Sequence, residues 1–175
     1  MRKYLITSIL LVIAMLYCSK TEATNWETDF KKASSAAKTS GKYMLLDFSG
    51  SDWCGWCKRM DKTTFNDPAV SLFLADHFYA VKLDAEQKEN IVHNGQTMKW
   101  VKAGRRGVHE LAYALLDGKM SYPTTVFLNE KLERITISPG YKGAKDFMNE
   151  LTYVKEEHYA NGISFDTYLQ KQISN

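Results

Sequence analysis

Cys54 and Cys57 are the residues of this sequence whose type and spacing point most clearly to chemistry. They enclose the run Cys-Gly-Trp-Cys, and a separation of three places both side chains on one face of a helix. A cysteine at the beginning of a helix lies at the positive end of the helix dipole, which stabilises its thiolate. The pair therefore predicts thiol–disulfide exchange, in which one sulfur attacks and the other resolves.

Two other uses of the same pair have to be weighed. The spacing also supplies half of a zinc site, but tetrahedral zinc needs four ligands and the sequence has no second cysteine pair. Its histidines, at positions 77, 93, 109 and 158, show no ligand-like spacing. An inert structural disulfide is the second alternative. Redox catalysis without a metal is favoured over both.

The composition limits the class of protein. A chain of 175 residues has room for one compact domain and a short appendage, and 45% hydrophobic residues suffice for a sizeable core. With 23 basic and 20 acidic residues the charge is too balanced for a nucleic-acid binder. Three cysteines are too few for a disulfide-stapled scaffold.

The first residues resemble an export signal. Arg2 and Lys3 precede an apolar run from Tyr4 to Tyr17, and a small-residue site of the kind that signal peptidases cleave ends in Ala23. A membrane-spanning helix needs about twenty apolar residues, and this run is shorter. A cleaved signal over 1–23 is therefore favoured, with the mature protein over 24–175 in the periplasm. A lipid anchor on Cys18 is less favoured, because bulky Tyr17 precedes it.

Hydrophobic periodicity predicts one α/β domain with a mixed sheet and helices on both faces. The run Tyr43–Phe48 is apolar throughout, as in a central strand buried on both faces. Thr24 and Glu27 have the spacing of a capping box, which places the beginning of the first helix near residue 25. Helices are expected at about 25–40, 54–64, 68–77, 108–116, 143–157 and 164–172, and strands at 43–48, 78–84, 124–128 and 132–137. The short connection 129–131 makes the last two strands an antiparallel hairpin.

Three separated motifs resemble the thioredoxin superfamily. They are Leu46-Asp47-Phe48 before the cysteines, Trp53-Cys54-Gly55-Trp56-Cys57-Lys58 around them, and Tyr122-Pro123-Thr124-Thr125 ahead of the hairpin. The segment from Thr64 to Val70 resembles the exported thiol-disulfide interchange branch. The resemblance covers about 26–151 and implies a thioredoxin-like three-layer fold, with an extra helical segment at the C-terminus.

The resemblance also implies roles for individual residues. Cys54 would be the exposed nucleophile and Cys57 the resolving thiol, with Asp47 exchanging a proton with Cys57. The alternative for Asp47 is a carboxylate satisfied by a neighbouring lysine or backbone donor. Pro123 would follow a cis peptide bond, and an extended substrate would lie beside it. The substrate-binding residues expected on this basis are Trp53, Trp56, Tyr122, Pro123 and Thr124.

Two departures from the pattern matter. Trp56 stands where thioredoxin has proline, so the direction of electron flow does not follow from the resemblance. The stretch 85–106 is longer than in a minimal thioredoxin. It is interpreted as a solvated surface insertion, in preference to a wall beside the substrate groove.

The resulting hypothesis is an exported protein thiol–disulfide oxidoreductase. It would act on protein thiols or disulfides as a monomer, with no bound cofactor, and with a membrane donor or acceptor where the reaction requires one. The rival is a non-catalytic thioredoxin-fold module that holds a metal or a protein partner through the thiols or the groove.

Overall fold

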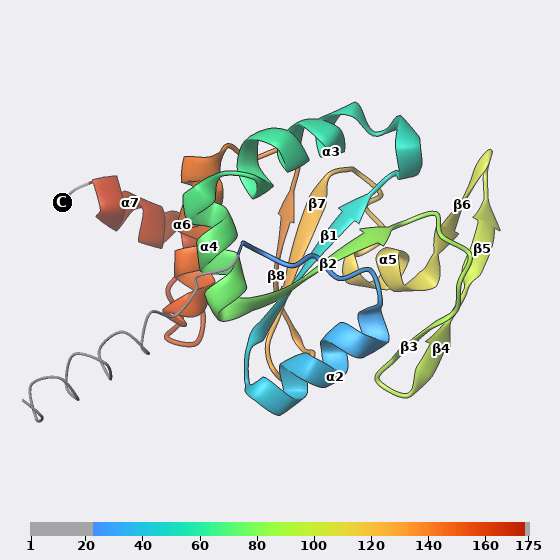
Figure 1. Ribbon diagram of the computed structural model, residues 1–175, viewed down its shortest axis with the longest axis horizontal. Coiled ribbons are helices and arrows are strands. Elements are labelled where there is room, and N and C mark those ends of the chain that lie inside the picture. Colours follow the sequence, from blue (N-terminus) through green and yellow to red (C-terminus); the bar gives the residue numbers. More distant parts are fainter. Residues whose placement is uncertain (1–22, 174–175) are drawn as a thin grey trace, which may run out of the picture.

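A four-stranded mixed sheet forms the centre of the computed structural model, which describes residues 23–173 (Figure 1). The strands lie in the order β2-β1-β7-β8. Their bounds are β1 Tyr43–Ser49, β2 Phe78–Asp84, β7 Thr124–Leu128 and β8 Arg134–Pro139. β1 pairs parallel with β2 and antiparallel with β7, and β7 and β8 form an antiparallel hairpin. The predicted mixed sheet and hairpin are confirmed.

Alternating side chains of β1 divide the core into two clusters. Met44 and Leu46 pack with α2 (Phe30–Ser40) and α5 (Glu110–Leu115). Leu45 packs on the opposite face with α3 (Gly55–Met60), α4 (Pro68–His77) and α6 (Ala144–Lys155). Because successive side chains of a strand point to opposite faces, a fully apolar strand requires cover on both sides. The three-layer arrangement is therefore confirmed.

The first helix begins later than predicted. It starts at Phe30, where the Asp29 side chain accepts from the amide of Lys32. The preceding residues are extended: the amide of Glu27 donates to Ala80 at 2.9 Å and its carbonyl accepts from Lys82 at 2.9 Å. The capping-box prediction was wrong because these bonds to the edge strand β2 replace the local cap.

The helix after the cysteines is composite. A 3-10 turn over Ser51–Trp53 precedes α3, and a π-helical segment over Asp61–Phe65 follows it. α4 then begins at Pro68, with Asp67 as its N-cap, as predicted. Ser51 adopts a φ of 40°, and its hydroxyl donates to Asp84 at 2.8 Å. The turn that leads into α3 is thus tied to the end of β2.

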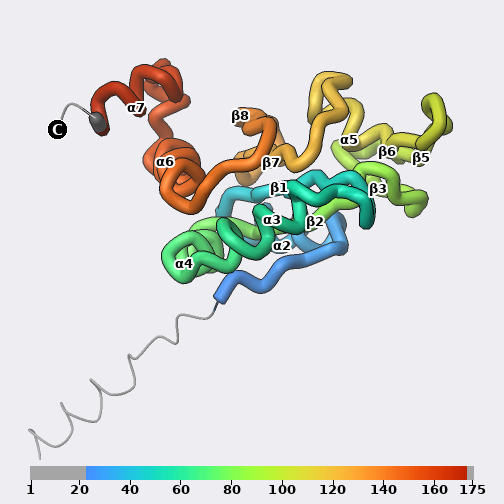
Figure 2. Tube along the Cα trace, turned by 90° about the horizontal axis from the view of Figure 1, so that it is seen from above, coloured from blue at the N-terminus to red at the C-terminus, as the bar shows by residue number. Residues whose placement is uncertain are grey.

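The stretch 85–106 folds into two β-hairpins. They are β3 (Ile91–His93) with β4 (Gln96–Met98), and β5 (Trp100–Ala103) with β6 (Arg106–His109). Together they form an arm at the end of the molecule opposite α6 and α7 (Figures 1 and 2). A Cβ at Gly107 would overlap the ring of Trp100, so glycine is required for this ring to lie across the hairpin. The predicted helix at 108–116 is shortened because 108 and 109 complete β6.

The C-terminal helical segment is present as α7 (Phe165–Ile173), which packs against α6. Tyr153 of α6 contacts Phe165 and Tyr168, with ring centroids 5.2 and 5.6 Å apart. β8 is shifted two residues from its prediction, because Leu132 belongs to the turn and has a φ of 65°.

The predicted signal over 1–23 and the anchor at Cys18 lie outside the described residues, apart from Ala23. No helix within 23–173 has both the length and the apolar character needed to cross a membrane.

Candidate active site

Cys54 and Cys57 form a disulfide at the beginning of α3. Cys54 is the N-cap of that helix, with extended backbone angles of φ −77° and ψ 91°. Its sulfur accepts a hydrogen bond from the amide of Cys57 at 3.2 Å. β1 and the tethered 3-10 turn place this cap at the carboxyl end of the central strand (Figure 1). The position is one in which helix amides would stabilise a thiolate on Cys54.

Both cysteines are buried in the oxidised state. Cys54 is 3% exposed and Cys57 is 6% exposed. The expectation of an exposed Cys54 is therefore wrong for this state. The reason is geometric: the Cys54 sulfur is bonded to Cys57 and turned over the first turn of α3, where the Cys57 amide contacts it.

An exposed tryptophan precedes each cysteine of the disulfide. Trp53 is 49% exposed and Trp56 is 55% exposed. Half-exposed indoles beside a buried disulfide give an apolar surface that an incoming polypeptide can cover. The two rings are held by different parts of the chain.

Trp53 is held by residues that are distant in sequence. Its indole N–H donates to Glu86 at 3.3 Å, and its ring centroid lies 6.0 Å from that of Tyr122. The Arg106 guanidinium, from the turn end of β6, lies 4.2 Å from the centre of the Trp53 ring. A Cβ at Gly50 would overlap Trp53, so the indole fits only over a glycine. The hairpin arm therefore contacts the residue next to Cys54, and the interpretation of 85–106 as a solvated insertion holds only for part of it.

Trp56 is held by the loop between β8 and α6. Its ring lies 5.6 Å from that of Tyr141, and the Arg59 guanidinium is 5.1 Å from the Trp56 ring and 5.3 Å from the Tyr141 ring. The Tyr141 hydroxyl is hydrogen-bonded to Thr63 at 2.9 Å. These contacts tie Trp56 to the loop between β8 and α6, whereas Trp53 contacts the segment after β2 and the hairpin arm.

The peptide bond between Tyr122 and Pro123 is cis, as expected. The carbonyl of Pro123 accepts from the amide of Gly140 at 2.8 Å, and Tyr122 packs on Trp53. Thr124 is 1% exposed, and its hydroxyl donates to Ser121 at 2.7 Å. The Thr124 side chain is therefore buried and already hydrogen-bonded, and its strand β7 is paired on both sides by β1 and β8.

Asp47 is a buried carboxyl group in the middle of the sheet. It is 4% exposed, and its Oδ1 has no hydrogen-bond partner within residues 23–173. Burial raises its pKa to about 7, the Lys82 charge opposes that rise, and the Asp61 charge adds to it. Such a group can take up or release a proton near neutral pH.

Lys82 faces Asp47 because the two are partners in the parallel β1–β2 register. Its ammonium lies 3.7 Å from Oδ2 of Asp47 and forms an ion pair with Asp61. It also lies over the ring of Trp26, 4.6 Å from the centroid. The lysine neighbour expected as the alternative for Asp47 is thus present, but it leaves Oδ1 without a hydrogen-bond partner among residues 23–173.

Sequence reasoning did not single out Lys82, Glu86, Tyr141 or Arg59 as parts of this site. A signal existed for Lys82, since a polar residue at the matching position of the neighbouring parallel strand tends to face Asp47. Arg59 also had a signal, because it follows Trp56 by three residues on the same helix. For Glu86 and Tyr141 no local pattern exists, because their contacts join segments far apart in sequence. Among the described residues 23–173, no group of three or more His, Cys, Asp or Glu side chains is arranged to hold a metal ion.

The sequence profile of the thioredoxin-like domain family matches residues 30–155. The chain belongs to this thioredoxin-like family. Two curated relatives are similar over parts of this thioredoxin-like chain. Disulfide bond reductase DsbH of Chlamydia pneumoniae is 32% identical over 65 residues, which cover 37% of the chain and 39% of that protein. The uncharacterized protein B0495.5 of Caenorhabditis elegans is 29% identical over 112 residues, which cover 64% of the chain and 13% of that protein. The matches thus span well under half of the length of either relative.

Solved structures share the thioredoxin-like fold. A DsbH oxidoreductase superposes with a TM-score of 0.55 at 18% identity, covering 77% of this chain and 86% of that one. A thioredoxin from Thermus thermophilus gives a TM-score of 0.56 at 24% identity, with 76% and 88% covered. A thioredoxin-fold protein from Helicobacter pylori gives 0.57 at 20% identity, with 77% and 82% covered. At these identities the similarity establishes the fold.

Proposed function

We propose that this chain is a thiol–disulfide oxidoreductase that exchanges disulfides with protein substrates through Cys54. The observation that carries the proposal is the Cys54–Cys57 disulfide at the head of α3, beside which Trp53, the residue before Cys54, packs on Tyr122, the residue before Pro123. Further support comes from the relative named a disulfide bond reductase. No bound cofactor enters the reaction, because the two sulfurs carry both electrons.

The reaction of the reduced protein takes two steps. The Cys54 thiolate attacks a substrate disulfide, that bond breaks, a mixed disulfide forms, and one substrate thiolate leaves. The Cys57 thiolate then attacks the Cys54 sulfur, and the second substrate thiolate leaves as the internal disulfide closes. Two electrons pass to the substrate, whose two thiolates take up two protons. Oxidation of a substrate dithiol is the reverse of this sequence.

Asp47 is proposed to accept the proton of Cys57 before the second step. Support comes from its burial, its unpaired Oδ1 and a pKa raised to about 7 by desolvation. A carboxyl group whose pKa lies near the pH of the solution is a suitable general base. The ammonium of Lys82, which lowers this pKa, keeps the ionised form accessible.

The substrate is proposed to lie as an extended segment across the disulfide. Trp53 and Trp56 would form the apolar rim, and the backbone of Tyr122, next to Pro123 and Thr124, would pair with it. Support comes from the exposure of both indoles and from the packing of Tyr122 on Trp53. Arg106 would act as a positioning residue, since it stacks on Trp53.

The protein is further proposed to act as an exported, periplasmic monomer. The basic start and apolar run of the first residues support export. In an oxidising compartment a reductase needs a membrane donor, whereas an oxidase or isomerase does not.

The test is insulin reduction with dithiothreitol as the electron source. Wild type should accelerate turnover, Cys54→Ser should abolish it, and Cys57→Ser should accumulate mixed disulfides that resolve slowly. Stoichiometric zinc or copper binding without turnover would instead support the non-catalytic module. The reduction potential then assigns direction: about −270 mV indicates a reductant and about −120 mV an oxidant.

A further inference from the structure

Each tryptophan that precedes a cysteine of the disulfide has an arginine on its ring. The guanidinium of Arg106 lies 4.2 Å from the ring centroid of Trp53, and that of Arg59 lies 5.1 Å from the ring centroid of Trp56. Both arginines are exposed. Stacking on a ring orients a guanidinium, which lowers the entropy that the side chain loses when it binds a ligand.

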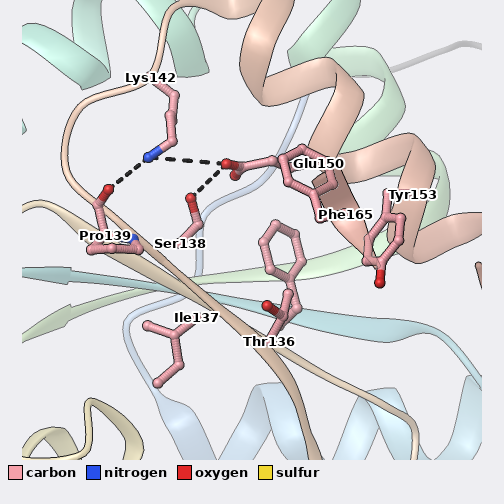
Figure 3. A pocket seen from close by; sticks show the side chains of 9 residues that line it. Thr136, Ile137, Ser138, Pro139, Lys142, Glu150, Tyr153 and Phe165 are labelled. Atoms are coloured by element: carbon pink, nitrogen blue, oxygen red, sulfur yellow. Dashed lines mark hydrogen bonds and ion pairs between the residues drawn. The ribbon is translucent and has the colours of Figure 1, made fainter. Parts of the chain in front are cut away.

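These two stacked arginines differ from other cations of the chain in having no acidic partner. Arg134 lies 2.7 Å from Asp117, and Lys142 lies 4.0 Å from Glu150 (Figure 3). Among residues 23–173, neither stacked arginine forms an ion pair with a carboxylate. A guanidinium presents its N–H donors in a planar fork that matches the oxygens of a carboxylate. The two stacked arginines can therefore bind carboxylates that a partner brings.

Two carboxylates beside Trp53 are engaged by other donors. The Ser51 hydroxyl lies 2.8 Å from Asp84 and 3.1 Å from Glu86, and the Trp53 indole N–H donates to Glu86 at 3.3 Å. Within the described part of the chain no ion pair joins these groups, or the exposed Asp52, to an arginine. Their negative charge weakens the attraction of distant anions, so recognition of a carboxylate depends on direct contact with the guanidinium groups.

The register of the β5–β6 hairpin separates Arg106 from the nearby cation Lys102. Arg106 pairs with Ala103, whereas Lys102 pairs with Gly107. Because paired residues share a face and successive residues alternate between faces, Arg106 and Lys102 lie on opposite faces of the hairpin. Lys102 is therefore a matched control: it has the same charge on the same hairpin, but on the face away from Trp53.

We propose that Arg59 and Arg106 select protein substrates that have acidic side chains on both sides of the reacting cysteine. This inference rests on the proposed redox function and names the substrate class of the same site. In an extended substrate, the residues two positions before and after the cysteine face the same side as its sulfur. Carboxylates at these positions pair with the two guanidinium groups, whereas carboxylates directly next to the cysteine point away from the protein.

The test measures how fast the reduced protein reduces disulfide-linked homodimers of short peptides with capped ends. The first peptide has Glu two positions before and after its cysteine, the second has Gln at those positions, and the third has Glu directly before and after the cysteine. Each dimer takes two electrons from the protein and yields two peptide thiols, which are quantified by chromatography after acid quenching. The rate of each dimer with dithiothreitol corrects for its intrinsic reactivity.

The first dimer should react about fivefold faster than either of the others, which is the factor expected of one or two solvent-exposed ion pairs. Arg106→Met keeps an apolar chain on Trp53 without the charge, so it should lower this preference to about twofold. The double variant Arg59→Met/Arg106→Met should abolish the preference, and Lys102→Met should keep it. A partial loss of folded protein changes the rates of all dimers alike, so the ratios remain valid.

Three results would overturn the inference. They are equal rates of the first and second dimers with the wild-type protein, equal rates of the first and third dimers, and a preference that survives in the double variant. In each of them the protein still reduces the peptides, so the proposed function stands. A protein that reduces no dimer faster than Cys54→Ser does would instead refute the proposed function, and the inference with it.

Discussion

Asp47→Asn should make the protein's stability less dependent on pH above pH 4. Burial raises the pKa of Asp47 from 3.8 to about 7, so the folded state holds this proton more tightly than the unfolded chain does. Between these two values the unfolded chain has lost the proton and the folded protein has kept it. Raising the pH through this window therefore destabilises the wild-type fold, and the effect levels off above about pH 7.

The size of the effect follows from the shift. A pKa rise of about three units corresponds to about 4 kcal/mol of lost stability once both states are ionised. Asp47 is 4% exposed, so solvent screening does not reduce this value greatly. Over the accessible range from pH 5 to pH 8, the free energy of unfolding of wild type should fall by about 3 kcal/mol relative to Asp47→Asn.

The assay is urea unfolding of the oxidised proteins at several pH values, because the disulfide then keeps the cysteines from titrating. Subtracting the free energy of unfolding of Asp47→Asn from that of wild type removes the contribution of every group that titrates alike in both proteins. Asp166→Asn is the control, since that exposed carboxylate meets water in both states. Curves of wild type and Asp47→Asn that stay parallel from pH 5 to pH 8 would refute the assigned burial cost.

Lys82→Met tests the second contributor to the same equilibrium. The Lys82 charge lowers the pKa of Asp47, so its removal should move the Asp47-dependent loss of stability to higher pH. The measurement compares Lys82→Met with the double variant Lys82→Met/Asp47→Asn in the same urea series. A transition that stays at the wild-type pH would show that this ammonium does not act on Asp47.

Two further variants probe the support of Trp53. Gly50→Ala would place a Cβ inside the Trp53 ring, so it should cost about 1–3 kcal/mol in thermal or urea unfolding, whereas Gly55→Ala, with open space around it, should change stability by about 0.5 kcal/mol or less. Equal effects of the two would mean that the indole does not need the glycine. Arg106→Ala removes the cation from the indole and should reduce kcat/KM for a protein substrate about two- to fivefold through KM, leaving the reaction with dithiothreitol unchanged. Lys102→Ala, exposed on the same hairpin, should alter neither, and a matching loss with dithiothreitol after Arg106→Ala would argue against a positioning role.

The sequence predicted the parts of the fold that depend on local patterns. A continuous apolar run identified the buried central strand, Asp67-Pro68 identified the beginning of a helix, and a three-residue connection identified the last hairpin. Each is encoded by residues that are neighbours in the chain, so periodicity and turn chemistry suffice. The same holds for the cysteine pair, whose spacing alone brings the two sulfurs together.

The hairpins of 85–106 pair residues that are close in sequence, and the Asn94-Gly95 turn is a local hairpin signal that hydrophobic periodicity does not capture. A local signal failed where a distant strand offered better partners. The capping box of Thr24 and Glu27 is replaced by hydrogen bonds between Glu27 and β2, whose proximity is created only by the folded sheet. Propensity is a weak prior against such tertiary pairing.

By itself the sequence determined that two thiols stand at a strand–helix junction, because residue type and spacing carry that information directly. Only the tertiary structure decided that Cys54 is covered in the oxidised state, that Arg106 lies on Trp53, and that one oxygen of Glu150 has no hydrogen-bond partner within the described part of the chain. The physical reason is that burial, and the electrostatic cost that comes with it, depends on which distant segments exclude water from a group. That exclusion exists only once the sheet and its helices have assembled.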